Sequence, residues 1–392
     1  MIPAPYITPK NQMKTFLEMF FYIKNKKMTN RIKGFDLART YAIFGMYVVN
    51  FAFCFGSFRG DTFLHYCMGL FVGNSTSIFI ICAGMGLVLM TNQADATVED
   101  KAKLRSVVMK RSWFLFALGL LLYPWWQGDI LHFYGGYMHI AAFMLFVPKQ
   151  NYLWAAFFAI VGYNILQFFV PITAAWNLAE YRYLDFWTPL GFLRNTIYNG
   201  WNSMFPWFAY FALGMWLAHL NWNDFKVQKR VFTFGFFLLA TFKVLRIFIR
   251  YDWNNPLRHG FYERNVLQLL EDYFPANIPF LMITTGWALM VISFCMYLGN
   301  RFSESKIVNI LTKTGQMTLS NYVLHTTLGM ILLSILTHKT YTGFPQMESP
   351  IEPIFVFIYA FSFFIFSVAF SYFWKKRFKN GPLEMLMRKI SG

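Results

Sequence analysis

Long apolar stretches alternate with short polar or basic segments along almost the whole chain. Ten of them are long enough, or nearly so, to cross about 30 Å of hydrocarbon as helices. They are 35–56, 65–90, 112–126, 134–148, 151–173, 204–220, 231–250, 275–298, 314–337 and 351–374. The third and fourth are short and flank Gln127, Gly128 and Asp129, so we interpret them as a helical hairpin with a polar tip inside the membrane. The pattern predicts an all-α, polytopic integral membrane protein with about ten transmembrane helices.

Composition excludes several other classes of protein. Of the 392 residues, 57% are hydrophobic and only 14% are charged, against about 25% charged residues in soluble globular proteins. Such a chain cannot cover a water-facing surface, so an ordinary soluble enzyme, a disordered protein and a fibrous protein are all excluded. The aromatic content of 21% is typical of lipid-facing helices and interfacial aromatic belts.

Lysine and arginine are distributed unevenly between alternate loops. The segments 1–34, 91–111, 148–150, 221–230, 299–313 and 375–392 contain 25 of the 35 basic residues, and the alternate loops contain seven. Cytoplasmic loops of membrane proteins are enriched in Lys and Arg, so both termini are expected in the cytoplasm. The net charge of +17 is spread over separate clusters, so we expect no nucleic-acid partner. The long aromatic loops 174–203 and 250–274 are expected to fold over the outer face.

The chain divides into three parts by this reading. Residues 1–34 form a cytoplasmic N-terminal amphipathic segment, in which 9–27 is expected to lie on the inner leaflet as a helix. Residues 35–374 form the helical bundle, and 375–392 form a basic cytoplasmic tail. No short apolar core with a small-residue cleavage site follows the start, so we expect no signal peptide. Of the four cysteines, Cys54 and Cys67 could form a disulfide near the outer surface, although simple packing is the favoured interpretation.

The first span opens with charged residues where charge is costly. Asp36 and Arg39 are three positions apart and share a helix face. They form either a structural ion pair at the inner interface or, together with Arg31 and Lys33, a site for an anionic ligand. Asn50 lies farther along the same helix, where it either bonds a neighbouring helix or lines a polar path.

Histidine and further polar residues mark the second span. His65 lies at its outer mouth, and histidine is the side chain best suited to carry a proton near neutral pH. The run Asn74-Ser75-Thr76-Ser77 follows, and four polar residues in succession suggest a polar cavity beneath His65. An ordinary interfacial histidine remains the alternative.

Two further segments place polar groups between apolar runs. The hairpin contains Asp129, His132, Tyr134 and His139, whose spacing is not diagnostic of a metal site, so we expect no metal and favour Asp129 as an orienting carboxylate. In the ninth span, Asn321 and His325 are four residues apart on one face, either as site residues or as satisfied buried groups. The chain has no Walker loop, dinucleotide fingerprint, zincin motif or nucleophile elbow.

Several of these segments together resemble two related families. RIKGFDLARTYAIFGMYVVN is similar to the opening shared by YeiB-like bacterial membrane proteins and the heparan-α-glucosaminide N-acetyltransferase family. QGDILHFYG and NGWNSMFPWFAYFALGMWLA resemble the hairpin and the FPW segment of the same superfamily. TGQMTLSNYVLHTTLG and GPLEMLMRK resemble YeiB-like endings, so the resemblance runs from about residue 31 to 390.

The resemblance implies a transmembrane acyltransferase-like fold in the bacterial inner membrane, with acetyl-CoA as donor. His65 stands at the place of the histidine proposed as catalytic in the N-acetyltransferase branch. The sequence departs from that branch in three ways: Ser77-Ile-Phe79 replaces an FPW, Asn74 or Ser75 replaces an Asp, and Thr40 replaces a Gly.

The function predicted is therefore transfer of an acyl group from cytosolic acyl-CoA to an external glycan or lipid-linked saccharide. The expected catalytic residues are His65, Asp129 and His325. The expected donor-binding residues are Arg31, Lys33, Asp36, Arg39 and Asn50, and the expected substrate-binding residues are Asn74, Tyr134, His139 and Asn321. We further predict that His65, Asn50, Asp129 and His325 converge on one cavity, reached by a tunnel from Arg39.

Two other functions remain open at this point. The alternative from another class is a transporter or exporter of a small metabolite or lipid, which would use the same histidines and carboxylates as a proton relay. A membrane scaffold without a site is the third. The lipid bilayer is an expected partner in every case, and a homodimer remains open.

Overall fold

The computed structural model describes residues 32–57, 62–91, 97–253, 273–339, 341 and 351–392. Arg31 and the amphipathic segment 9–27 lie outside this part of the chain. So does most of the loop 250–274.

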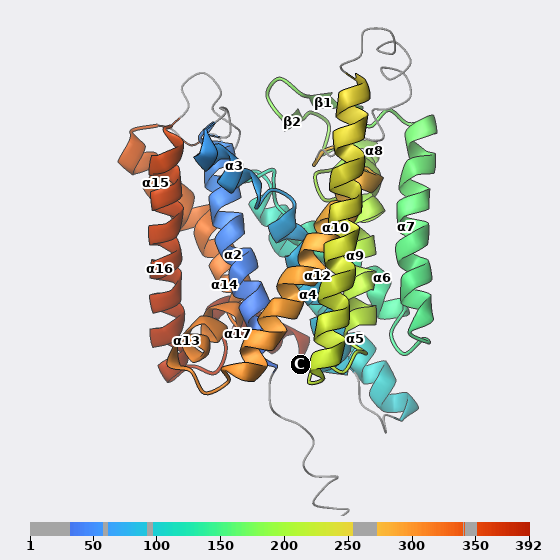
Figure 1. Cartoon of the computed structure of the whole chain (residues 1–392), viewed down its shortest axis with the longest axis vertical. Coiled ribbons are helices and arrows are strands. Elements are labelled where there is room, and N and C mark those ends of the chain that lie inside the picture. Colours follow the sequence, from blue (N-terminus) through green and yellow to red (C-terminus); the bar gives the residue numbers. More distant parts are fainter. Residues whose placement is uncertain (1–31, 58–61, 92–96, 254–272, 340, 342–350) are drawn as a thin grey trace, which may run out of the picture.

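The described chain is almost entirely helical (Figure 1). Its first half contains the helices α2 (Lys33–Cys54), α3 (Phe63–Gly69), α4 (Asn74–Thr91), α5 (Val98–Leu122), α6 (Leu131–Phe143), α7 (Gln150–Phe169), α8 (Pro189–Arg194) and the π-helical turn η1 (Asn195–Asn199). The second half contains α9 (Met204–Leu217), α10 (Phe225–Trp253), α12 (Ile278–Arg301), α13 (Lys306–Gly315), α14 (Thr318–Leu324), η3 (His325–Gly329), α15 (Met330–Thr337), α16 (Pro353–Arg377) and α17 (Pro382–Ser391). Strands β1 (Trp176–Asn177) and β2 (Arg182–Tyr183) form one short antiparallel hairpin.

Seven helical segments are long and apolar enough to span a membrane. They are Lys33–Cys54, Phe63–Thr91, Gln150–Phe169, Phe225–Phe248, Ile278–Arg301, Thr318–Thr337 and Pro353–Arg377. The predicted polytopic helical membrane fold is thus confirmed, while the number of ten spans stays a prediction. The predicted spans 112–126, 134–148 and 204–220 are not among these seven. The physical cause is that α5 begins in a charged segment, and that α6 and α9 are only 13 and 14 residues long.

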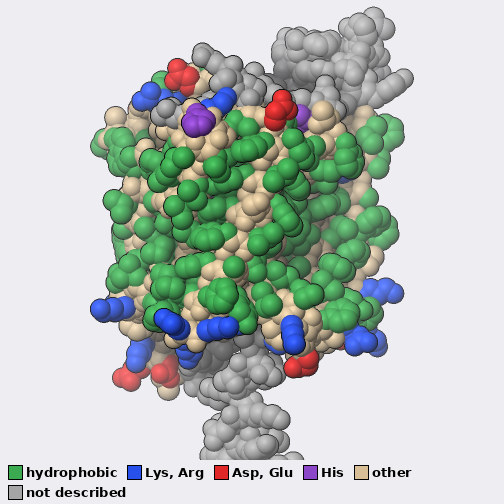
Figure 2. Space-filling view, turned by 90° about the vertical axis from the view of Figure 1, so that its left-hand side faces the viewer, with side chains coloured by type: hydrophobic (Ala, Val, Ile, Leu, Met, Phe, Trp, Pro, Cys, Tyr) green, Lys and Arg blue, Asp and Glu red, His purple; other side chains and the backbone are tan. Residues whose placement is uncertain are grey.

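The two ends of the bundle differ in charge. Figure 2 shows a broad apolar band with Lys and Arg side chains gathered below it. Figure 1 places the start of α2, the helices α13 and α17 and the C-terminus at this end, which we call the basic end. The β1–β2 hairpin lies at the other end, as expected for a loop that covers the outer face. The cytoplasmic position of the basic end remains a prediction from the Lys and Arg bias.

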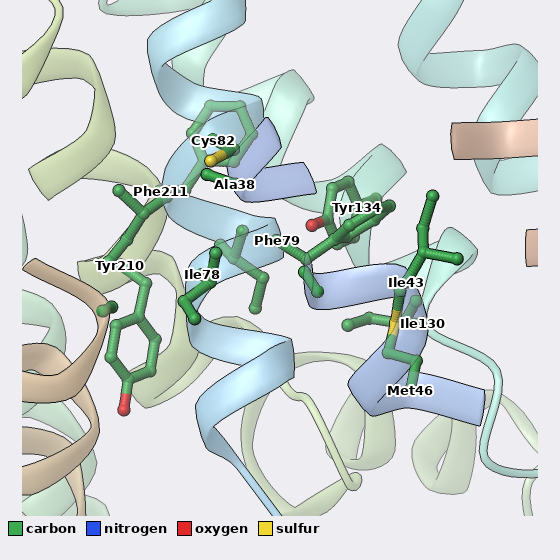
Figure 3. Packing of buried hydrophobic residues seen from close by; sticks show 14 of the residues in the cluster. Ala38, Ile43, Met46, Ile78, Phe79, Cys82, Ile130, Tyr134, Tyr210 and Phe211 are labelled. Carbon is green, nitrogen blue, oxygen red and sulfur yellow. The ribbon is translucent and has the colours of Figure 1, made fainter. Parts of the chain in front are cut away.

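Helix α2 lies at the centre and packs against α4, α12, α13 and α16. Small residues make these close approaches: a Cβ on Gly34 would lie 2.5 Å from the Met296 Cα, and one on Gly299 would lie 2.4 Å from the Gly34 nitrogen. The apolar side chains of α2 and α4 then fill the middle of the bundle (Figure 3). Cys54 and Cys67 are free thiols, so packing rather than a disulfide accounts for them.

The predicted span 65–90 is divided into α3 and α4. Gly73 has a φ of +72° between them, a conformation that favours glycine. Asn74 then begins α4, and its Nδ2 donates to the Leu70 carbonyl oxygen at 2.7 Å. Ser77 Oγ donates to the Asn74 carbonyl oxygen at 2.9 Å. Asn74 and Ser77 therefore satisfy backbone groups around a helix start, while Asn74 Oδ1 and Ser75 Oγ are buried without a hydrogen-bond partner among the described residues.

Candidate functional site: a cavity at the basic end

A cavity of about 580 Å³ opens at the basic end between α2, α4, α5, α6, α14 and α17. Most of its lining is apolar. The charged residues in its wall are Asp36, Arg39, Arg111, Glu384 and Arg388. We call this space the inner cavity.

Arg39 is held in the wall of the inner cavity by two contacts. Its Nη1 lies 3.3 Å from Asp36 Oδ1, and its Nη2 donates to the Cys82 carbonyl oxygen at 2.9 Å. Gln316 Nε2 donates to the second Asp36 oxygen at 3.2 Å. Gly86 leaves room for the guanidinium, since a Cβ there would lie 2.5 Å from Arg39 Nη2. The predicted ion pair thus forms and faces the bundle interior, with the Asp36 side chain only 2% exposed.

Tyr134 lies at the deep end of the inner cavity, beside Phe79 and Leu131. The residue is 5% exposed, and its hydroxyl has no hydrogen-bond partner among the described residues. A buried hydroxyl without a partner is costly. This one is therefore a candidate to bond a ligand that enters the cavity.

An apolar plug, made of Ile43, Phe79, Ile130 and Tyr134, lies at this deep end. Figure 3 shows Phe79 and Tyr134 facing each other beside α2, with Ile43 and Ile130 next to them. The Phe79 and Tyr134 ring centroids are 5.3 Å apart, and all four side chains are buried. The residues that line the inner cavity include Phe79 and Tyr134 at this level and do not include His65, so the tunnel to His65 stays a prediction.

Asp129 is fully buried just beyond the plug. Its Oδ2 accepts hydrogen bonds from the backbone nitrogens of Leu131 at 2.8 Å and His132 at 3.1 Å. These are the first free N–H groups of α6, so the carboxylate caps that helix. His132 Nδ1 lies 3.2 Å from the same oxygen, and the Tyr322 hydroxyl donates to Oδ1 at 3.1 Å. Both oxygens of the carboxylate are thus engaged in hydrogen bonds.

Tyr322 extends this network to two further predicted residues. Its ring centroid lies 5.2 Å from that of His325, and His325 Nε2 lies 3.0 Å from Asn50 Nδ2. Asp129 and His325 therefore both contact Tyr322, and Asn50 joins them through its hydrogen bond to His325. Sequence reasoning did not select Tyr322, although it stands three residues before His325 on the same helical face.

His65 lies on the short helix α3. Its Nδ1 is 2.6 Å from the Thr62 hydroxyl. Its Nε2 is buried without a hydrogen-bond partner in the described chain. Thr62 therefore fixes the ring through one nitrogen and leaves the other available.

Asn321 and His139 do not line the inner cavity, and each contacts a neighbouring helix. Asn321 Nδ2 donates to Ser371 Oγ on α16 at 3.1 Å. His139 Nδ1 lies 2.8 Å from the Gly135 carbonyl oxygen and also contacts the Ser112 hydroxyl.

Lys33 lines a separate polar groove at the basic end and bonds Asn309 Oδ1 at 2.7 Å. Arg31 lies outside the described residues. Across the described ranges, no three His, Cys, Asp or Glu side chains gather as a metal site would require.

Comparison with known families places this cavity in context. The catalytic domain family of heparan-alpha-glucosaminide N-acetyltransferase matches residues 31–247, more than half of the chain. The chain belongs to this family. A second family, described as "Protein of unknown function (DUF418)", matches residues 265–392. No curated protein and no solved structure matches the chain.

The protein is therefore a multi-pass membrane protein of an acetyltransferase-like family. The two matched regions meet at the inner cavity. Arg39, Arg111 and Tyr134 come from the first region, and Glu384 and Arg388 come from the second.

Proposed function

We propose that the protein transfers an acyl group, most simply acetyl, from cytosolic acyl-CoA to an acceptor at the opposite membrane face. A glycan or lipid-linked saccharide is the proposed acceptor. The observation that carries the proposal is the inner cavity itself. It combines arginines near a mouth at the basic end with a buried Tyr134 hydroxyl at its deep end, for which the described residues provide no hydrogen-bond partner.

This arrangement fits the chemistry of an acyl-CoA. The donor has a polyanionic nucleotide at one end and a thioester at the end of a long, uncharged arm. Guanidinium groups bind phosphate well because they present several donors in a planar fork. The mostly apolar wall suits the arm. Tyr134 can then donate a hydrogen bond from its hydroxyl to the thioester carbonyl oxygen, where negative charge develops during attack.

The reaction itself is an acyl substitution. The hydroxyl oxygen or amine nitrogen of the acceptor attacks the thioester carbonyl carbon, and the carbon–sulfur bond breaks. The acceptor loses a proton to a general base, and CoA leaves as a thiolate that is protonated to the thiol. His65 is the proposed base, since Thr62 holds its Nδ1 and its Nε2 is available.

Asp129, His325 and Asn50, which are linked through Tyr322 and one another, have a positioning role in this proposal. Asp129 fixes the start of α6, and hence the helix that carries Tyr134. The hydrogen bond between His325 and Asn50 links η3 to α2. Asp129, His325 and Asn50 thus keep the deep end of the cavity in a defined geometry.

In this proposal the apolar plug separates the bound donor from His65 until the acceptor arrives. Transfer therefore requires the plug to move when donor and acceptor are both bound. Such closure has a chemical benefit, because a sealed site keeps water away from the thioester until the acceptor arrives.

Release of CoA thiol from acetyl-CoA by the purified protein in detergent tests this function. Turnover without a sealed compartment is expected of an enzyme and excludes transport as the sole activity. Arg39→Lys should raise the KM for acetyl-CoA, because an ammonium cannot hold Asp36, the Cys82 carbonyl and a ligand in the same geometry. Arg301→Lys, at an exposed position outside the cavity, is the matched control. Absence of thiol release by the native protein, with glucosaminides and membrane saccharides supplied, would contradict the proposal.

A further inference from the structure

The C-terminal helix α17 is fixed to α14 by reciprocal capping. The Glu384 carboxylate accepts hydrogen bonds from the backbone nitrogens of Leu319 at 2.9 Å and Ser320 at 3.2 Å, in the first turn of α14. Ser320 Oγ in turn accepts from the Leu383 nitrogen, in the first turn of α17, at 3.1 Å, and also contacts Glu384. Each helix thus satisfies free N–H groups of the other.

Gly381 makes this contact sterically possible. A Cβ at this position would lie 2.1 Å from Glu384 Oε2 and 2.8 Å from Ser320 Oγ. The segment predicted from sequence as a basic tail is therefore a folded element with a defined seat. Its far end is held as well, since Arg111 Nε on α5 donates to Ser391 Oγ at 3.2 Å.

This seat places Arg388 in the wall of the inner cavity, together with Arg111. The cavity wall contains three arginines and two carboxylates. Asp36 pairs with Arg39, and Glu384 bonds the start of α14. Within the described chain, neither Arg111 nor Arg388 forms an ion pair with a carboxylate. The mouth of the cavity therefore carries two positive charges that its own carboxylates do not pair.

We propose that α17 is part of the donor site, with Arg388 and Arg111 binding the phosphate groups of the nucleotide end of acyl-CoA. This inference rests on the proposed function. It makes the C-terminal helix a determinant of donor recognition, and the contact between Glu384 and Ser320 the device that holds it in place.

Two features support phosphate as the group bound. Two guanidinium groups that line one cavity without an ion pair to a carboxylate of the described chain repel each other, and a multiply charged anion removes that repulsion. Their position also suits the donor, because a nucleotide at the mouth leaves the deeper apolar wall and Tyr134 for the thioester arm. An anionic phospholipid headgroup offers the same phosphate chemistry, so the experiment must separate the two sources.

The test compares two thioester donors, acetyl-CoA and acetyl-pantetheine, which lacks phosphates. Arg388→Gln is expected to raise the KM for acetyl-CoA about tenfold or more, the usual size of a lost hydrogen bond between charged groups. It should leave the kinetics with acetyl-pantetheine within about twofold. Lys389→Gln is the matched control, because Lys389 is exposed on the same helix and does not line the cavity.

Several outcomes would overturn the inference. Equal effects of Arg388→Gln on both donors would indicate a structural role, and equal KM values for Arg388→Gln and Lys389→Gln would remove Arg388 from recognition. If Arg388→Gln weakens competition by added anionic phospholipid but not the binding of CoA, the site belongs to lipid.

Equilibrium titration with CoA separates this inference from the proposed function. If the native protein does not cleave acetyl-CoA, the proposed function fails, and the titration still decides the phosphate site. Weaker CoA binding in Arg388→Gln than in Lys389→Gln supports the site. Equal affinity, or no CoA binding by the native protein, overturns it.

Discussion

The Tyr322 hydroxyl donates a 3.1 Å hydrogen bond to Asp129, a residue 193 positions earlier in the chain. The same oxygen accepts from the Ile130 backbone nitrogen at 3.2 Å. One side chain of α14 thus holds the hairpin between α5 and α6. Because Asp129 lies in the first matched region and Tyr322 in the second, this contact joins the two at the deep end of the cavity.

Tyr322→Phe is expected to lower the free energy of unfolding by about 1–3 kcal/mol, because a buried carboxylate loses a donor and a buried N–H loses its acceptor. Thermal unfolding in detergent measures this loss. Tyr66→Phe, at a site 71% exposed, should leave the transition unchanged. A Tyr322→Phe protein as stable as the native one would show that this contact does not hold the hairpin.

Gly84→Ala should separate α4 from α9. A Cβ on Gly84 would lie 2.1 Å from the Phe211 carbonyl oxygen, and backbone on both sides cannot yield easily. We expect a destabilisation of about 1–3 kcal/mol, as for other overpacked sites. Gly69→Ala serves as the control, since a Cβ there meets nothing within 4 Å. Equal unfolding midpoints for the two variants would contradict this packing.

Glu384→Gln should loosen α17 from the bundle. The amide keeps the shape of the side chain but replaces one acceptor oxygen with a donor and removes a charge that favours a helix N-terminus. A loss of about 1 kcal/mol is expected, as for other helix caps. Faster hydrogen exchange of the backbone amides in α17 and in the first turn of α14 would measure this loss of stability. Lys389→Gln should exchange like the native protein, and unchanged protection in Glu384→Gln would show that the cap is not needed.

A cysteine at Lys379 tests the predicted orientation. Lys379 lies between α16 and α17 at the basic end and is exposed, so an impermeant thiol reagent should label Lys379→Cys only after the cells are opened. A cysteine at Leu184, which is 63% exposed near β2, should be labelled in intact cells. The reverse pattern would overturn the orientation and, with it, the side from which the donor enters.

Much of the fold follows from the sequence because hydrophobic length and Lys and Arg bias act locally. Helices α7, α12 and α16 fall close to their predicted ranges. The polar run Asn74–Ser77 stays a predicted cavity wall, but the break in the predicted span was missed, since nothing local in the sequence reveals that Gly73 ends the helix there. The sequence predicts a tail at 375–392 because it does not reveal the hydrogen-bond partner of Glu384. That partner is Ser320, which is 64 residues away along the chain.

The site was predictable only in part, for a related reason. The cost of placing a charged or polar side chain inside a membrane is enough to identify Asp36, Arg39, Asp129 and His325 as candidates, because such a group needs a partner there. It does not identify the partner. Tyrosine is ordinary in a membrane helix, so the role of Tyr322 becomes visible only when α14 is packed against the hairpin.

Transfer in sided proteoliposomes tests the central claim most directly. Acetyl-CoA labelled in its acetyl group is supplied to the basic face, and glucosaminide and membrane saccharides are enclosed at the other face. We expect CoA thiol on the donor side and the label covalently bound to saccharide on the opposite side, with the transfer lost in His65→Ala. Intact labelled acetyl-CoA crossing the membrane, or a thioester that stays uncleaved, would contradict the account.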